Sequence, residues 1–134
     1  MQLFARKYIY DDGGRRKAGY RRQANDCVVR AIAIASEMPY ESIRTALEAM
    51  AKAQSRQCVD KGVFRETYHP LLTDMGWHYE GPWMPTPIWD IPLGRVICRL
   101  QHHLVAVIDG MPHDTHNAFR GKKRDILAYY TPPS

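Results

Sequence analysis

The sequence contains no long apolar run. A helix that spans a bilayer needs roughly 18 or more apolar residues, and no segment of this chain approaches that length. The first residues, Met1 to Arg6, also lack the apolar stretch of a secretory signal. We therefore expect a soluble, unexported, cytoplasmic chain without a membrane partner.

Cysteine is scarce. The three cysteines, Cys27, Cys58 and Cys98, stand far apart, and no CxxC pair occurs. An odd number without paired spacing argues against a disulfide framework and is typical of a reducing compartment. Cys98 lies in an apolar segment, where cysteine usually acts as a small buried hydrophobic residue. Cys58 carries no functional expectation.

Signatures of nucleic-acid binding are also missing, with no zinc-finger, RRM or helix-turn-helix pattern. The net charge is nevertheless +5, concentrated at 15–17, 21–22 and 120–124. Such clusters are most often solvated loops. A nucleic acid or an acidic protein that binds these loops is the less favoured alternative.

The 134 residues, 45% of them hydrophobic and 25% charged, have the length and composition of one soluble domain. No internal repeat is present. We divide the chain into a basic N-terminal segment (1–24), a helical part (25–76) and a β part (77–134). This order predicts an α+β domain in which a central buried helix packs on a C-terminal antiparallel sheet.

Hydrophobic periodicity and turn residues predict the individual elements. Helices are expected over 26–36, 39–54 and within 63–75, where Pro70 suggests a regular part that begins near His69. Strands are expected over 7–10, 77–80, 95–100, 103–108, 111–116 and 126–130.

Residues 81–92 contain four prolines, which argue against a helix or a central strand. We expect an extended arm whose tryptophans, Trp83 and Trp89, cover the sheet. The alternative is that the two tryptophans form the wall of a substrate-binding cleft.

The segment 25–36 starts with Asn25 and Asp26, both favourable helix N-cap residues, and continues as an almost wholly apolar helix. Such a helix belongs inside the domain, and only Arg30 is expected to reach water. Cys27 lies in the first turn, where the helix dipole favours a thiolate over a thiol. The segment predicts a nucleophilic cysteine at the start of a buried helix.

The dipeptide Asp109-Gly110 predicts a two-residue hairpin turn, which pairs Ile108 with Met111. In that register His103 and Asp114 are diagonal neighbours on one face, about 7–8 Å apart between backbones. Their side chains can meet, so the hairpin supplies a base and a carboxylate that orients it.

Two alternatives remain open. A three-residue loop would shift the register by one residue and turn His102 toward Asp114, although the turn sequence favours His103. A metal site could use Cys27 together with these N and O ligands: His102, His103, His113, Asp114 and His116. No familiar zinc spacing is present, and the favoured hypothesis requires neither a metal nor another cofactor.

Asn25-Asp26-Cys27 at the start of an apolar helix, followed by 103–107 and then by Asp114, resembles the papain-like cysteine peptidases. The chain is most similar to the bacteriocin-processing (C39) type and to small phage and bacterial proteins of that kind. The resemblance implies a papain-like fold in which Cys27, His103 and Asp114 form the catalytic triad.

These residues predict a thiol hydrolase or an acyl transferase that acts on a protein or peptide. The backbone N–H of Cys27 and the side chain of Gln23 are the candidate oxyanion donors. The alternative is a catalytically inactive papain-like binding or inhibitor protein that grips its partner through the basic loops. The oligomeric state has no signature in the sequence.

Overall fold

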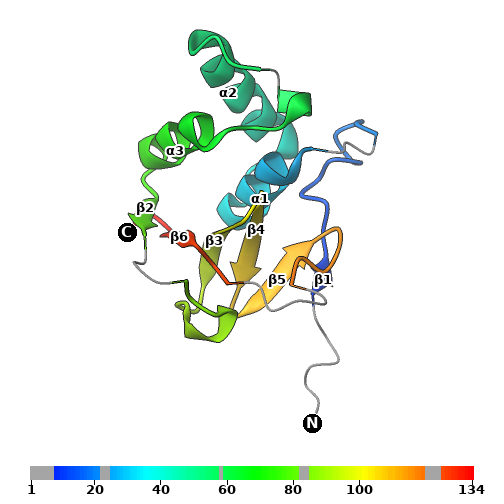
Figure 1. Ribbon diagram of the computed structural model, residues 1–134. Coiled ribbons are helices and arrows are strands. Elements are labelled where there is room, and N and C mark those ends of the chain that lie inside the picture. The colour runs from blue at the N-terminus through cyan, green and yellow to red at the C-terminus, as the bar shows by residue number, and fades with distance from the viewer. Residues whose placement is uncertain (1–7, 22–24, 58, 82–84, 120–124) are drawn as a thin grey trace.

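The computed structural model describes residues 8–21, 25–57, 59–81, 85–119 and 125–134 (Figure 1). These residues form an α+β fold with a six-stranded sheet, as predicted at the level of the fold class. The α-helices are α1 (Cys27–Ser36), α2 (Tyr40–Ala53) and α3 (Arg65–Asp74). The strands are β1 (Ile9–Tyr10), β2 (His78–Glu80), β3 (Arg95–Leu100), β4 (His103–Ile108), β5 (Met111–Asp114) and β6 (Ala128–Thr131).

The sheet has the strand order β1-β5-β4-β3-β6-β2 and is mixed, because β1 runs parallel to β5. The strands of the C-terminal part pair antiparallel with one another, as predicted, and the parallel edge is added by β1 from the N-terminal segment. Ile9 pairs with His113 and Tyr10 with Asp114, and the chain then turns toward the start of α1. Because β5 also ends beside α1, β1 must run in the direction of β5.

The predicted hairpin is confirmed. Ile108 pairs with Met111 and Ala106 with His113, across a two-residue turn in which Asp109 and Gly110 have φ angles of 50° and 81°. Positive φ at both positions matches the right-handed twist of a hairpin and favours Asp-Gly. Strand β5 ends at Asp114, two residues earlier than expected.

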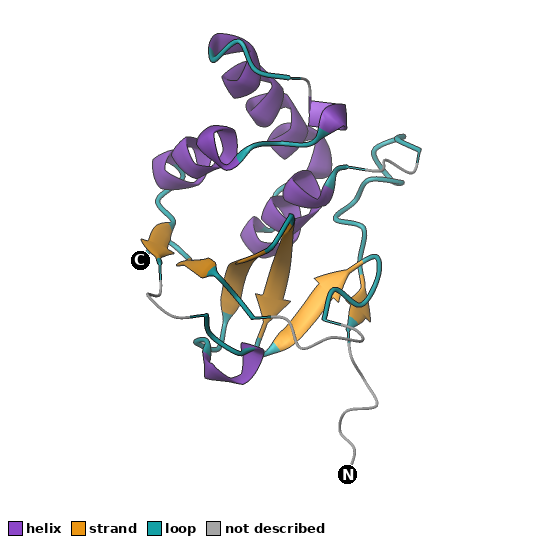
Figure 2. Ribbon diagram, viewed as in Figure 1, coloured by secondary structure: helices purple, strands orange, loops and turns teal. Residues whose placement is uncertain are grey.

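Two apolar clusters flank the sheet. The helices lie on one side (Figure 2), where α1 packs on β3 and β4, α2 packs on α1, and α3 packs on α2 and β2 to form one apolar cluster with Ile97, Leu104 and Ala106. A second cluster forms around Val96, Val105 and other strand residues together with parts of the irregular segments. Both faces are therefore covered.

Helix α1 contacts β3, β4 and β5 and is buried from Val28 to Ala35. Its position in the core confirms the prediction of a central buried helix. Arg30 was expected to reach water, and that expectation was wrong, because only 6% of this residue is exposed. Across the described ranges, no helix is both long and apolar enough to cross a membrane.

Helix α3 begins at Arg65, four residues earlier than predicted, and contains Pro70. Proline removes the N–H that would bond to the carbonyl of Glu66, four residues earlier. The side-chain amide of Gln54 donates to that carbonyl at 2.8 Å instead. A substitute donor from the residue that follows α2 thus allows α3 to extend on both sides of the proline.

The proline-rich segment does not pack through Trp89, whose exposed fraction is 72%. Residues Ile88 to Asp90 form a short 3₁₀-helix, and Ile88 and Ile91 pack against the second apolar cluster. Isoleucines therefore anchor this segment. Thr86 makes a bridge with Ile126, which precedes β6 instead of belonging to it as predicted.

Candidate active site

The start of α1 meets the start of β4. Cys27 is the first residue of α1 and His103 the first residue of β4, and both line a pocket of about 400 Å³. The Cys27 thiol and the His103 imidazole are hydrogen-bonded. The backbone N–H of Leu104, the next residue of β4, also donates to the sulfur. A helix terminus and a strand terminus thus hold the sulfur and the imidazole together.

The end of β5 supplies a carboxylate to the same imidazole. His103 Nε2 donates to Asp114 Oδ2 at 2.7 Å, and the Thr115 N–H donates to Asp114 Oδ1 at 2.7 Å. His102 lies in the turn between β3 and β4 with a φ of 59°. The residue in contact with Asp114 is therefore His103, as the two-residue hairpin predicted.

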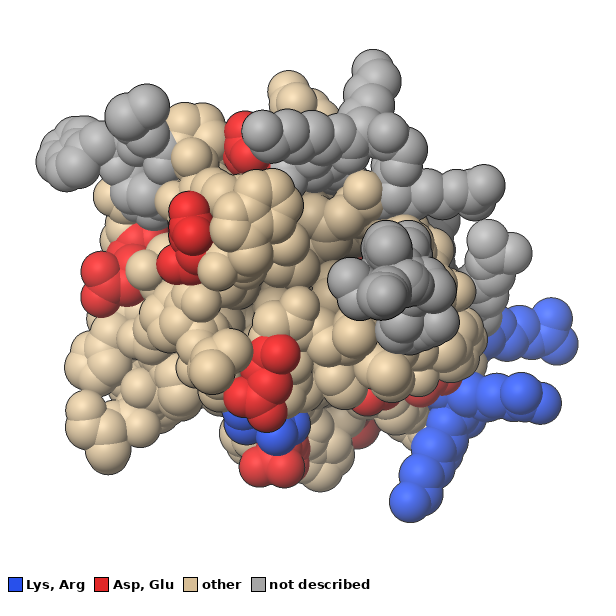
Figure 3. Space-filling model, turned by 90° about the horizontal axis from the view of Figure 1, so that it is seen from below, with Lys and Arg blue, Asp and Glu red and all other residues tan. Residues whose placement is uncertain are grey.

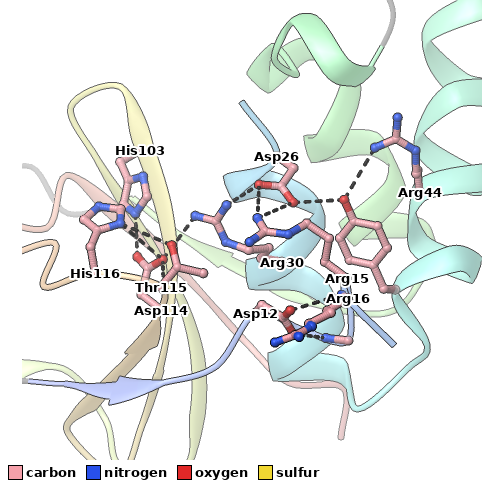
Figure 4. A network of polar contacts seen from close by, with 12 residues as sticks. Asp12, Arg15, Arg16, Asp26, Arg30, Arg44, His103, Asp114, Thr115 and His116 are labelled. Atoms are coloured by element: carbon pink, nitrogen blue, oxygen red, sulfur yellow. Dashed lines mark hydrogen bonds and ion pairs between the residues drawn. The ribbon is translucent and has the colours of Figure 1, made fainter. Parts of the chain in front are cut away.

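Arg30 connects this carboxylate to the interior of the domain (Figure 4). Its Nη2 donates to Asp114 Oδ1 at 3.1 Å, and its Nη1 donates to Asp26 Oδ1. The side chains of Arg30 and Asp114 are 7% and 3% exposed. Arg30 thus bridges two buried carboxylates that belong to α1 and β5.

Asp26 was predicted to cap α1, yet its side chain makes no capping hydrogen bond. Its carboxylate instead accepts a hydrogen bond from Arg15 Nη1, at 3.2 Å to Oδ2, and another from the Tyr40 hydroxyl at 2.9 Å. Arg15, placed by sequence in a solvated basic cluster, is 8% exposed. Together with the contact from Arg30, these two hydrogen bonds satisfy a carboxylate that is wholly buried.

The network favours the thiolate of Cys27. Burial raises the pKa of this thiol, but the hydrogen bond and charge of His103, the Leu104 amide and the charge of Arg30 together bring the pKa below its ordinary value. For His103, burial lowers the pKa, whereas hydrogen bonds to Asp114 and Cys27 raise the pKa to about 9. Opposite shifts of this kind favour a thiolate–imidazolium pair.

Asp114 stays ionised for a similar reason. Burial raises the pKa of the carboxyl group, but its hydrogen bond to His103, the charge of His103, the Thr115 amide and Arg30 together hold the pKa below the ordinary value of 3.8. An ionised Asp114 can accept the Nε2 proton of His103 in a hydrogen bond. The imidazole is thereby oriented, with its other ring nitrogen left for the thiol.

Sequence reasoning missed Arg30, Arg15 and Tyr40 as part of this network. Asp26 and Arg30 have the i,i+4 spacing of a helical ion pair, so their contact could have been predicted from the sequence. The contacts of Arg15 and Tyr40 have no local signal, because both residues are more than ten positions from Asp26. Only the tertiary fold brings them to that carboxylate.

Within the described residues, one set of three side chains could hold a metal ion. One ligand atom from each of His103, Asp114 and His116 lies within 4.8 Å of the others. The nitrogen and oxygen of His103 and Asp114 are already joined at 2.7 Å, a hydrogen-bond distance. A metal between these atoms would have to replace that hydrogen bond and with it the link from Asp114 to the base.

The remaining predicted residues fall into two groups, those outside the described ranges and those that lie away from the pocket. Gln23 and Trp83 lie outside the described residues, as does Cys58. Trp89 precedes the Arg95 end of β3, whereas His103 pairs with Leu100 at the other end. Trp89 therefore forms no wall of this pocket. Cys98 is fully buried, as predicted, and burial raises its pKa.

The basic clusters are described only in part, since Arg22 and residues 120–124 lie outside the described ranges. Arg16 and Lys17 are exposed, unlike Arg15. On the face shown in Figure 3, the described Lys and Arg side chains project mainly at one edge, and Asp and Glu are spread over the rest. This face presents mixed charge over its described surface.

A scan against protein-family models and searches of curated proteins and of solved structures found no match to the chain.

Proposed function

We propose that the chain is a papain-like cysteine hydrolase or acyl transferase that acts on a protein or peptide. The observation that carries the proposal is the continuous contact from Cys27 through His103 to Asp114, at the start of a buried helix. This arrangement contains a nucleophile, a base beside it and a carboxylate that orients the base. No metal or cofactor is required by the chemistry.

The reaction follows from the protonation states of the pair. The Cys27 thiolate attacks the carbonyl carbon of an amide or thioester, and the imidazolium of His103 gives its proton to the leaving amine or thiol. The acyl group remains on sulfur as a thioester. Neutral His103 then takes a proton from water, which attacks the thioester and releases the acid. An amine in place of water would complete a transfer.

The start of α1 supplies donors for the oxyanion of the tetrahedral intermediate. The first N–H groups of a helix lack intrahelical acceptors, and the Asp26 side chain does not cap them. The N–H of Cys27 is the candidate donor, aided by the helix dipole. Asn25, which lines the same pocket, is a second candidate with a side-chain amide.

The resemblance to papain-like peptidases fits this placement of parts, with cysteine on a helix and histidine and aspartate on the adjoining sheet. In this proposal the buried network of Arg30, Asp26 and Arg15 has a supporting role. It neutralises the carboxylate next to Cys27 in the chain, which would otherwise disfavour a thiolate.

Alkylation by iodoacetamide, followed by mass spectrometry between pH 5 and 9, tests the proposal. Cys27 should react at pH 6 many times faster than a free cysteine, whose pKa is about 8.5. Cys27→Ser controls for labelling elsewhere, and Asp114→Asn should reduce the rate at pH 6 about tenfold or more, because the imidazolium loses its anionic partner. A Cys27 that follows the free-thiol profile would contradict the proposal and favour the inactive binding protein.

A further inference from the structure

The pocket at Cys27 is cationic. Arginines from three elements line it, namely Arg30, Arg65 and Arg99, whereas no Asp or Glu does so among the described residues. Arg30 is already paired with Asp114 and Asp26. The other two arginines therefore determine which charge the pocket accepts.

Arg99 has no carboxylate partner within the described parts of the chain. Its Nε is buried without a hydrogen-bond partner, and its side chain makes no ion pair there. Every Asp and Glu of the sequence belongs to the described ranges, so the remaining segments contribute none. A buried guanidinium nitrogen without a hydrogen-bond acceptor is costly for the fold, and an anionic ligand in the pocket would supply that acceptor.

Arg65 is the first residue of α3 and is exposed. A cation at a helix N-terminus is disfavoured by the helix dipole. No ion pair with a described residue offsets this effect for Arg65. Helix stability therefore does not explain the choice of arginine at this position of the pocket.

The hydroxyl of Tyr68 is influenced electrostatically by both arginines and by Cys27. This buried residue lines the same pocket from α3. Burial raises the pKa of its phenol to about 12, while Arg99 and Arg65 act to lower it and the charge of Cys27 acts to raise it. Arg65, Arg99, Tyr68 and Cys27 all line the same pocket, so the two cations and the nucleophile face one cavity.

We infer that the substrate carries a carboxylate next to the bond that is cleaved, and that Arg99 and Arg65 bind this carboxylate. An acidic side chain at the acyl residue of a peptide has the required chemistry. The inference rests on the proposed function and adds the substrate class. Paired guanidinium groups recognise a planar carboxylate through two-pronged hydrogen bonds, which a neutral amide of the same shape cannot replace.

A matched pair of probes tests this selectivity. Acetyl-peptidyl chloromethyl ketones that end in Asp or Asn differ only in charge at that side chain. The Cys27 thiolate displaces chloride from either probe, so that a carbon–sulfur bond forms and chloride leaves. Second-order labelling rates, measured on the full chain and divided by the rates with free cysteine, correct for intrinsic reactivity.

The Asp probe should label Cys27 about tenfold or more faster than the Asn probe at low salt, and added NaCl should reduce the ratio. Arg99→Gln should bring the ratio of the two labelling rates close to one. Arg65→Gln should also lower the ratio. Because Arg65 is exposed, this variant provides an independent test if Arg99→Gln fails to fold. Lys52→Gln, on the exposed face of α2, is the matched loss of one positive charge and should leave the ratio unchanged.

Two failures are distinguishable. If the Asn probe labels Cys27 much faster than free cysteine and the Asp probe has no advantage, the substrate inference is overturned while the thiol site stands. If neither probe exceeds the rate with free cysteine, the proposed function fails and the inference with it.

Discussion

At the level of single residues, six side chains form a series of alternating charge, buried from Arg15 to Asp114 and partly buried at His103 and Cys27. In order of contact they are Arg15, Asp26, Arg30, Asp114, His103 and Cys27. With the imidazolium and thiolate formed, the three positive and three negative groups of this series cancel. Each charge is stabilised by its neighbours, which makes ionisation of the Cys27 thiol favourable in its partly buried position.

Arg30→Met tests the central member of this series. The substitution retains an apolar stem but leaves Asp26 and Asp114 without the cation between them. Because loss of one partner leaves a buried charge without its counter-charge, the free energy of unfolding should fall by about 3–5 kcal/mol, as measured by urea denaturation. Lys17→Gln removes an exposed positive charge and should change stability by less than about 0.5 kcal/mol. A loss below about 1 kcal/mol for Arg30→Met would show that the carboxylates do not depend on it.

At the scale of elements, two short connections align the site. The Asp109-Gly110 turn pairs β4 with β5 and so brings Asp114 beside His103. The two-residue turn at 101–102 places His103 at the first position of β4, next to the start of α1. Short turns of fixed geometry permit little variation in register, which keeps the base and its carboxylate together.

Gly110→Ala tests the turn. A side chain at a φ of 81° is strained although there is open space around it, so the cost is conformational, about 1–2 kcal/mol of unfolding free energy. Thermal or urea unfolding measures this cost. Asp109→Asn is the matched control, because Asn tolerates positive φ and retains the oxygen that accepts from the Gly94 N–H. Equal stability of Gly110→Ala and the unmodified chain would contradict the turn geometry.

At the scale of the whole molecule, the buried network joins regions that are distant in sequence. Arg15 comes from the segment after β1, Tyr40 begins α2, Arg30 lies on α1, and Asp114 ends β5. Their polar contacts converge beside the site (Figure 4). Stability and thiol reactivity should therefore depend on the same ionised groups.

The pH dependence of stability tests this link. The folded pKa of Asp114 lies below 3.8, so its stabilising charge is complete above that value and is lost as the pH falls further. The folded pKa of His103 is raised from 6.5 to about 9, so stabilisation by the imidazolium is complete below pH 6.5 and is lost as the pH rises through about 9.

The melting temperature should therefore decline on the acid side below pH 4 and on the alkaline side near pH 9, as differential scanning calorimetry can measure. Asp114→Asn removes the carboxyl group and with it the anionic partner of His103, so both declines should become shallower. Unchanged slopes in this variant would contradict the assignment of the two transitions to Asp114 and His103.

Local patterns in the sequence predicted most of the helices and strands and the register of the central hairpin. The apolar run after Asp26 predicted a buried α1 with Cys27 in its first turn, and Asp109-Gly110 predicted the pairing that brings His103 to Asp114. These features depend on periodicity and on backbone angles of neighbouring residues, which are local properties. Local patterns could therefore identify Cys27, His103 and Asp114 as a nucleophile, a base and a carboxylate, although the first and last are almost ninety positions apart. Local patterns could not show that the three side chains are in contact.

The arrangement of the charges depends on contacts between distant segments and could not be predicted from local patterns. The hydrophobic pattern of the helix predicted an exposed Arg30, and the basic cluster 15–17 predicted an exposed Arg15. Both side chains are instead buried against Asp26. The parallel pairing of β1 likewise depends on the edge of β5, which comes from a distant part of the chain. The early start of α3 depends on the side-chain amide of Gln54. Burial of a charge depends on a counter-charge from a distant segment, and the stabilisation exists only once folding has brought the two together.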